Sequence, residues 1–201
     1  MRLYLATSNP HKIQELHALL AEAGLDIEVQ TAEALGGMPE VVEDQDSFTG
    51  NALKKARALA ALLPTDGLAL ADDSGICAVA LDHAPGVYSA RYAGENASDL
   101  DNLYKLLDEL DSVQDPDRAG YFACHLASVD ASGEETVFVG ECHGNIIRKP
   151  RGENGFGYDP VFVPLGHERT TAEMSQDEKA ELSHRGIATR KFIAWLKERL
   201  M

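Results

Sequence analysis

A short apolar run that ends in two aspartates is the feature that most constrains the fold of this chain. Residues 68–71 are Leu-Ala-Leu-Ala, and Asp72, Asp73, Ser74 and Gly75 follow directly. A four-residue apolar run bounded by turn residues is typical of a buried strand. Ligands of open α/β sheets bind at the carboxyl ends of strands, so two carboxylates there suit a hard divalent cation. A solvated Asp-Asp turn is the alternative when this stretch is considered alone.

The composition limits the class of protein. A length of 201 residues with 44% hydrophobic content predicts one domain, residues 1–201, with its own core. The net charge of −15 disfavours binding to nucleic acid or to an anionic membrane. Cys77, Cys124 and Cys142 have no paired spacing, which indicates core residues rather than a metal or redox site. With no signal peptide and no apolar run of about 20 residues, we expect a cytoplasmic protein.

The N-terminal segment predicts a strand, a polar loop and a helix. Residues 2–6 form the predicted strand, and the helix begins at Pro10 with Asn9 as its N-cap. The loop of residues 7–12, Thr-Ser-Asn-Pro-His-Lys, offers hydroxyl, amide and ammonium donors beside a helix N-terminus. Such donors suit phosphate, although the glycines of a Walker loop are missing and many helices begin this way without a ligand.

The middle of the chain predicts a mixed sheet. A helix over residues 47–63 follows an acidic stretch, residues 40–46, which is either surface or the source of a further metal ligand. We predict another strand over residues 76–81, and a hairpin of residues 119–129 and 136–143. Adjacent antiparallel strands after strand–helix alternation imply a mixed sheet. The predicted fold is an elongated single α/β domain with a central mixed β-sheet flanked by helices, in two lobes with a cleft between them.

Two features in the C-terminal third indicate a ligand. Residues 155–160, Gly-Phe-Gly-Tyr-Asp-Pro, combine glycines that permit close approach with aromatic faces, although a glycine-rich hairpin loop is the alternative. Ser175 and Glu178 match a capping box, with Lys179 just beyond it. His184 and Arg185 open the last helix, where positive charge opposes the helix dipole, so a nearby anion would explain them.

Five stretches in the same order resemble one family, the non-canonical purine nucleoside triphosphate pyrophosphatases. They are residues 7–12, 70–75, 85–92, 155–160 and 183–185, and they extend over essentially the whole chain. The resemblance implies hydrolysis of ITP, dITP and XTP to the monophosphate and pyrophosphate, which cleanses the nucleotide pool. It also implies a Mg²⁺ cofactor and a homodimer.

The resemblance assigns a role to each matching residue. Asp73 would be the general base and a metal ligand, with Asp72 and Glu43 as the other metal ligands. Phe156 would stack on the base. The remaining residues would contact substrate: Thr7, Ser8, Asn9, Pro10, His11, Lys12, Ser74, Gly157, Tyr158, Asp159, Lys179, His184 and Arg185.

The chain departs from the family pattern at two positions. The family usually has two adjacent acidic residues ahead of its second helix, where this chain has Val42 and Glu43. Family members also often have glutamate where Gly50 precedes Asn51.

Three other interpretations remain open. A septum-inhibitor-type pyrophosphatase for modified nucleotides would favour Ser-Pro-Arg-Arg in the first loop, which this chain lacks. A non-catalytic nucleotide-binding regulatory module would not need Lys12, Asp72 and Asp73, all of which are present. A generic acidic α/β domain without a ligand leaves the five stretches unexplained.

Overall fold

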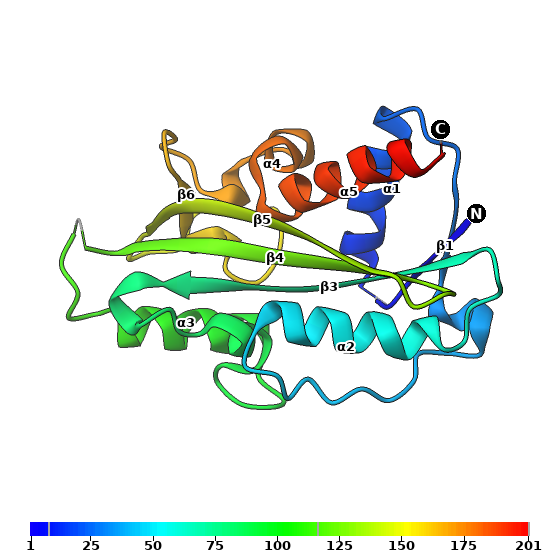
Figure 1. Cartoon of the computed structure of the whole chain (residues 1–201). Coiled ribbons are helices and arrows are strands. Elements are labelled where there is room, and N and C mark those ends of the chain that lie inside the picture. The colour runs from blue at the N-terminus through cyan, green and yellow to red at the C-terminus, as the bar shows by residue number, and fades with distance from the viewer. Residues whose placement is uncertain (8, 116, 201) are drawn as a thin grey trace. The chain divides into compact units, whose positions relative to one another are not determined.

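The computed structural model describes residues 1–7, 9–115 and 117–200. Within these residues the strands form a six-stranded mixed sheet in the order β2-β1-β3-β4-β5-β6, flanked by helices (Figure 1). β1 pairs in parallel with β2 and β3, whereas β5 pairs with β6 antiparallel. The strands are β1 Arg2–Leu5, β2 Glu28–Thr31, β3 Gly67–Ala78, β4 Ala119–Asp130, β5 Glu135–Ile146 and β6 Phe162–Pro164. The helices are α1 Pro10–Glu22, α2 Phe48–Ala60, α3 Asp99–Glu109, α4 Gln176–Leu182 and α5 His184–Leu200. The predicted α/β class with a mixed sheet is confirmed.

Local sequence signals account for several helix boundaries. The hydroxyl of Ser175 accepts the backbone N–H of Glu178, and the Glu178 side chain accepts the N–H of Ser175, so the predicted capping box forms. A second capping box joins Ser98 and Asp101 at the start of α3. Ser47 caps α2 by accepting the backbone N–H of Gly50. These bonds satisfy N–H groups that a helix leaves unpaired at its first turn.

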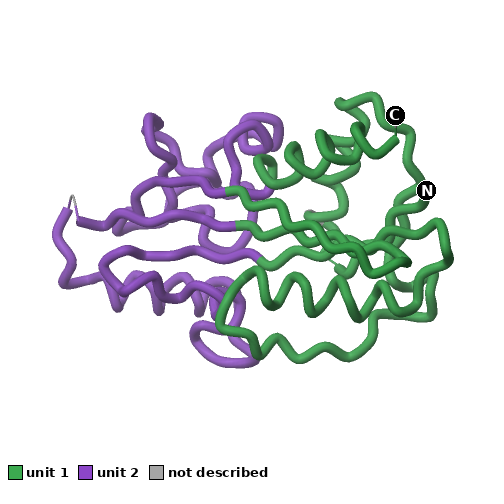
Figure 2. Tube along the Cα trace, viewed as in Figure 1, with its two compact units in different colours: residues 1–73, 124–140, 186–201 green, residues 74–123, 141–185 purple. Residues whose placement is uncertain are grey.

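The chain divides into two compact units, and β3, β4 and β5 each pass through both (Figure 2). Unit 1 comprises residues 1–73, 124–140 and 186–201, and unit 2 comprises residues 74–123 and 141–185. The cleft predicted from the sequence stays a prediction.

Unit 1 packs helices on both faces of its strands. The leucines of β1 and β3 point to one face, where they meet leucines of α1 and Phe192 of α5. The alternate side chains, Tyr4 and Ala69, point to the other face and pack with Leu59 of α2. This alternation follows from the two-residue period of a strand.

Unit 2 has a separate core. Leucines of α3, including Leu103 and Leu106, pack with Ile76 of β3, Phe122 of β4 and Phe162 of β6. Cys77 and Cys142 are buried here and Cys124 is buried in unit 1, which confirms their prediction as core residues.

The structure corrects the predicted turn at Ser74 and Gly75. Both residues lie inside β3, which runs unbroken from Gly67 to Ala78, and the predicted strand 76–81 instead ends in a 3-10 helix, Val79–Leu81. β3 lies between two other strands in the sheet, so strand pairing overrides the local turn preference of a Ser-Gly pair. The short strand β6 had no sequence signal.

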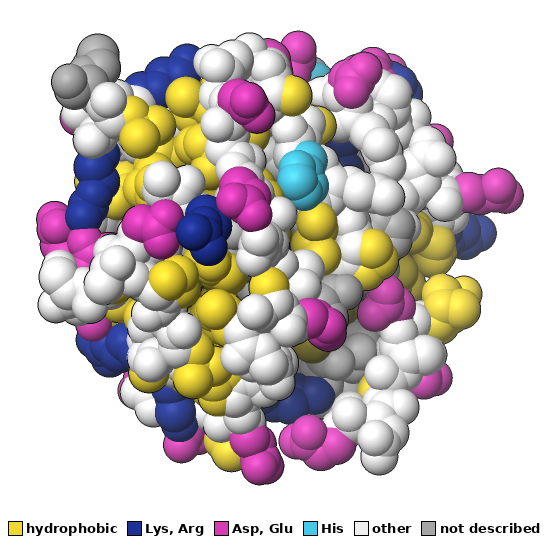
Figure 3. Space-filling model, turned by 90° about the vertical axis from the view of Figure 1, so that its right-hand side faces the viewer, with side chains coloured by type: hydrophobic (Ala, Val, Ile, Leu, Met, Phe, Trp, Pro, Cys, Tyr) yellow, Lys and Arg dark blue, Asp and Glu magenta, His cyan; other side chains and the backbone are white. Residues whose placement is uncertain are grey.

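The surface is acidic without a concentration of one charge on the visible face. Figure 3 shows Asp and Glu side chains spread over one face, with Lys and Arg side chains among them. No helix in the described part of the chain has the length and apolar character needed to cross a membrane.

Candidate active site

Asp72 and Asp73 lie in β3 just beyond the last residue that pairs with β1. The final pair of the parallel ladder is Leu5 with Leu70, and the N–H of Ala6 donates to the Leu70 carbonyl over 2.9 Å. The two aspartates therefore follow the carboxyl end of β1, where ligands of parallel sheets bind. Both are nearly buried, at 8% and 7% exposed.

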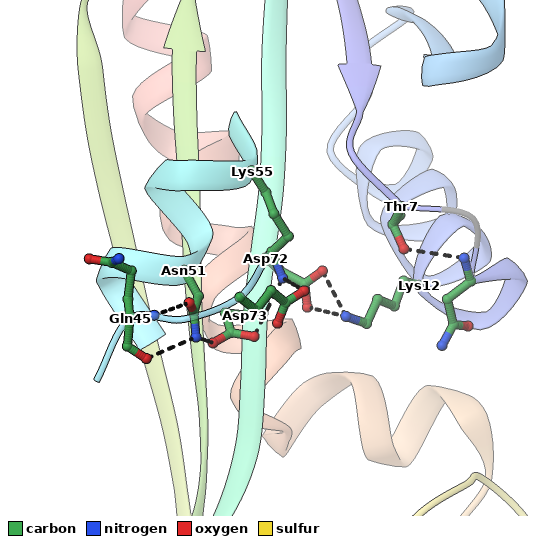
Figure 4. A network of polar contacts seen from close by, with 9 residues as sticks. Thr7, Lys12, Gln45, Asn51, Lys55, Asp72 and Asp73 are labelled. Carbon is green, nitrogen blue, oxygen red and sulfur yellow. Dashed lines mark hydrogen bonds and ion pairs between the residues drawn. The ribbon is translucent and has the colours of Figure 1, made fainter. Parts of the chain in front are cut away.

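Asp72 is paired with a lysine from the first turn of α1. The Lys12 Nζ lies 2.9 Å from Oδ1 and 2.8 Å from Oδ2 of Asp72 (Figure 4). Next to it, the hydroxyl of Thr7 accepts the backbone N–H of Asn9 over 3.2 Å, which shapes the loop that enters α1. The first turn of α1 thus carries the Lys12 ammonium group to Asp72.

Asp73 is held by two residues of α2. The Asn51 Nδ2 donates to Asp73 Oδ2 over 3.2 Å, and the Lys55 Nζ lies 3.4 Å from Asp73 Oδ1. The same ammonium lies 3.0 Å from a carboxylate oxygen of Glu43. Asn51 and Lys55 share a helix face because they are four residues apart. Lys55 thereby joins Glu43 and Asp73.

The side chains around Asp73 carry one negative charge in excess, because three carboxylates face two ammonium groups. We name this group the Asp73 cluster; its members are Lys12, Glu43, Asn51, Lys55, Asp72 and Asp73. The pKa of Asp73 is raised to about 6, chiefly by burial and in smaller part by Glu43 and Asp72, against the opposing effects of Lys55 and Asn51. Burial would lower the pKa of Lys55, but Asp73, Asp72 and Glu43 outweigh burial and raise it. Lys55 therefore stays charged while Asp73 titrates near neutral pH.

A pocket of about 320 Å³ opens beside the Asp73 cluster in unit 1. Its lining includes Thr7, Lys12, Glu43, Lys55 and Asp72. Two ammonium groups and a threonine side chain therefore face a space in which an anion would find donors, beside carboxylates that suit a divalent cation.

The raised pKa of Asp73 predicts a pH-dependent stability difference. In the presence of a chelator, Asp73→Asn should be more stable than the wild type at pH 8, by at most about 3 kcal/mol for a shift of two pKa units. The folded pKa lies above the unfolded value, so ionised Asp73 costs stability above pH 6, and that cost disappears as the pH falls from about 6 towards 4. Urea unfolding at pH 8 and pH 4.5 measures the difference between the two proteins, and an equal difference at both would contradict it.

Unit 2 holds a second group, around Phe156. The Lys179 Nζ lies 2.6 Å from Asp159 Oδ2 and 5.1 Å from the centre of the Phe156 ring. The Arg185 guanidinium carbon lies 5.8 Å from the same ring. We name Phe156, Asp159, Lys179 and Arg185 the Phe156 cluster. An aromatic face with two cations beside it suits a planar ligand that carries hydrogen-bond acceptors.

The glycine-rich turn positions Phe156 through Asp159. The carboxylate of Asp159, 3% exposed, accepts the Phe156 N–H over 2.9 Å and the Thr171 hydroxyl over 2.9 Å. Gly155 has a φ of +78°, and a Cβ there would lie 2.1 Å from Asp159 Oδ2. The glycine at position 155 is therefore needed for its close contact with Asp159, while the predicted close approach of this turn to a ligand stays a prediction.

The other residues predicted to contact substrate lie outside the two named clusters. His184 stacks on Phe122 with ring centres 4.8 Å apart, and the Tyr158 hydroxyl donates to the Ser89 carbonyl. The backbone N–H of Gly157 donates to Asp99. Ser74 is half-buried in β3, and Pro10 begins α1 exposed. Ser8 and the side chain of His11 lie outside the described part of the structure.

Sequence reasoning missed Lys55 and the role of Asn51. Both lie on α2, where Asn51 is buried along with the apolar residues Ala52, Ala56 and Leu59. The available signal was their four-residue spacing, which places an amide and an ammonium together on one face of the helix.

The donor set fits magnesium. Among the described residues, no group of three or more His, Cys, Asp or Glu side chains is arranged to hold a metal ion. Mg²⁺, however, binds through one or two carboxylates together with water and substrate phosphates. Asp73 and Glu43 offer such oxygens, and the excess negative charge of the cluster favours a cation.

In this α/β sheet, carboxylates and lysines gather beyond the carboxyl end of a parallel strand, the place where open sheets of this class bind their ligands. The chain belongs to the Ham1 family, whose model matches residues 3–195. It is 49% identical to a dITP/XTP pyrophosphatase of Opitutus terrae over 199 residues, covering 97% of this chain and 98% of the relative. It is 45% identical to a dITP/XTP pyrophosphatase of Streptomyces avermitilis, covering 99% and 98%.

Solved structures of the same family share the fold. A HAM1 protein from Coxiella burnetii superimposes with a TM-score of 0.89 at 39% identity, covering 98% of this chain and 99% of the other. The Ham1 protein of Staphylococcus aureus gives a TM-score of 0.88 at 36% identity, covering 99% and 100%.

Proposed function

We propose that this protein hydrolyses ITP, dITP and XTP to the nucleoside monophosphate and pyrophosphate. The observation that carries the proposal is the position of Asp73, a carboxylate held by Lys55 and Asn51 beside a pocket that both ammonium groups and carboxylates line. Relatives that cover nearly the whole chain bear the name dITP/XTP pyrophosphatase. Phosphoanhydride cleavage needs charge neutralisation and a positioned water, and the Asp73 cluster contains groups for both.

In this proposal the Asp73 cluster acts on the triphosphate. Lys12 and Lys55 neutralise phosphate charge, with Thr7 and the following loop, residues 8–11, as further contacts. Asp73 accepts a proton from the attacking water at the α-phosphorus. Asp73 and Glu43, with Asp72, would hold Mg²⁺, which supplies charge neutralisation at the phosphate oxygens when bound.

The Phe156 cluster binds the base in the same proposal. Phe156 stacks on the purine, and Lys179 donates to the 6-oxo group. Lysine has donors and no acceptor, so the 6-amino group of adenine finds no partner there. His184 and Arg185, with Ser74 and residues 157–159, complete the substrate contacts. The single domain of residues 1–201, the homodimer, the cytoplasmic location and the cleansing of the nucleotide pool belong to this proposal through the family resemblance.

A substrate panel tests the proposal. The purified protein is incubated with ITP, dITP, XTP, GTP and ATP, each with Mg²⁺ and with a chelator. We expect rapid turnover of the first three, loss of turnover with the chelator, and at least about 100-fold slower turnover of ATP because its 6-amino group leaves the donor of Lys179 unpaired. Equal turnover of all five would contradict the role of Lys179, and no turnover of any would favour the regulatory module.

A further inference from the structure

We infer that Asn51 is a positioning residue that orients the Asp73 carboxylate for the reaction. This inference rests on the proposed function. Asn51 is fully buried, at 0% exposed, and its side-chain amide is bonded to Asp73 and to the Gln45 backbone. It therefore acts through Asp73 and not by touching substrate.

The Asn51 amide has only one orientation that satisfies its surroundings (Figure 4). Its Oδ1 accepts the backbone N–H of Gln45 over 3.1 Å, so its Nδ2 faces Asp73 Oδ2 at 3.2 Å and the Gln45 carbonyl at 3.5 Å. A flipped amide would place an oxygen against the carboxylate and a donor against an N–H group. The Gln45 backbone thus decides which end of Asn51 meets Asp73.

Two donors on different oxygens define the plane of the carboxylate. Asn51 binds Oδ2 and Lys55 approaches Oδ1 at 3.4 Å. The Asn51 bond also ties Asp73 to the acidic stretch that carries Glu43, because Gln45 lies two residues beyond Glu43. Loss of Asn51 would free the carboxylate to rotate about its side-chain bonds.

Gly50 allows this arrangement in this chain. A Cβ at Gly50 would lie 2.8 Å from the Cβ of Gln45, closer than side chains tolerate. Any side chain at this position would therefore displace Gln45. Gly50→Ala should shift Gln45, and with it Ser47, whose Oγ would lie 3.1 Å from the new Cβ, while the Asn51 side chain itself is unchanged. The substitution therefore tests the contact between Gln45 and Asn51 from the Gln45 side.

Steady-state kinetics of ITP hydrolysis at saturating Mg²⁺ and pH 8.5 test the inference. Asn51→Ser should lower kcat about 10- to 100-fold, the loss expected for one hydrogen bond to a charged group, with KM within about twofold. Gly50→Ala should also lower kcat, by a smaller factor than Asn51→Ser does, and should likewise leave KM unchanged. Leu59→Ala, at an equally buried position of α2 that packs against Tyr4 and Ala69, is the matched control and should lower the melting temperature without lowering kcat.

The outcomes separate this inference from the proposed function. If the wild type hydrolyses ITP while Asn51→Ser and Gly50→Ala both keep its kcat, Asn51 does not position Asp73 and the function stands. A kcat loss in Leu59→Ala equal to that in Asn51→Ser would make the effect one of general stability, which also overturns the inference. If Asn51→Ser fails to fold, the kcat of Gly50→Ala alone tests the inference, and a wild-type kcat in that variant overturns it. A wild type without turnover would overturn the proposed function and, with it, the inference.

Discussion

Asp73→Asn is expected to lower the turnover of ITP by at least about 1,000-fold, the scale of removing a general base that also binds a catalytic metal. The amide can neither accept a proton at neutral pH nor hold a divalent cation well. Nucleotide affinity should change by less than about threefold, since lysines 12 and 55 remain to bind phosphate. Single-turnover kinetics measure the chemical step, and calorimetry measures affinity.

Asp130→Asn is the matched control for this substitution. Asp130 also lies in unit 1, where its carboxylate accepts from Ser132 and Arg199 at the end of β4. The exchange should leave turnover unchanged. An Asp73→Asn protein that keeps more than about a tenth of wild-type turnover would exclude general-base catalysis by this residue, given the size of effect expected.

Lys179→Met is expected to remove the preference for 6-oxo purines. The side chain loses its donor to the base and its ion pair with Asp159, while the methionine keeps similar bulk. We expect kcat/KM for ITP to fall about 100-fold, as for a lost hydrogen bond to a charged donor, with a much smaller change for ATP. Measurements of kcat/KM for ITP and for ATP on the same protein sample give the ratio of the two values directly.

Lys191→Met controls for the loss of a lysine. Lys191 donates to the Val139 carbonyl in unit 1 and has no role in the Phe156 cluster. It should leave the ratio of ITP to ATP turnover at the wild-type value. If Lys179→Met lowers kcat/KM for ITP and for ATP by the same factor, Lys179 contributes to substrate binding but does not discriminate between the two bases.

Sequence patterns predicted the elements whose boundaries depend on local chemistry. The capping box at Ser175 and the first helix at Pro10 both form as expected. The predicted turn at Ser74 and Gly75 was wrong because strand pairing with neighbours distant in the sequence decides the conformation there. Turn preference is a local property, whereas sheet pairing is not.

The candidate site was predictable in its carboxylates and only partly in what surrounds them. Asp72 and Asp73 follow an apolar run that marks a strand, but the partner of each is set by tertiary structure. Lys12 reaches Asp72 across 60 positions of sequence, and Asn51 reaches Asp73 across 22. The resemblance gave Asp73 its proposed role, and no residue pattern indicated that Lys55 would join Asp73 to Glu43.

The products of ITP hydrolysis test the central claim most directly. Purified protein with Mg²⁺ and ITP is sampled over time, and nucleotides, pyrophosphate and orthophosphate are quantified separately. Attack at the α-phosphorus predicts IMP and pyrophosphate in equal amounts, without IDP. Accumulation of IDP and orthophosphate would mean attack at the γ-phosphorus, and would contradict the placement of the triphosphate against Asp73.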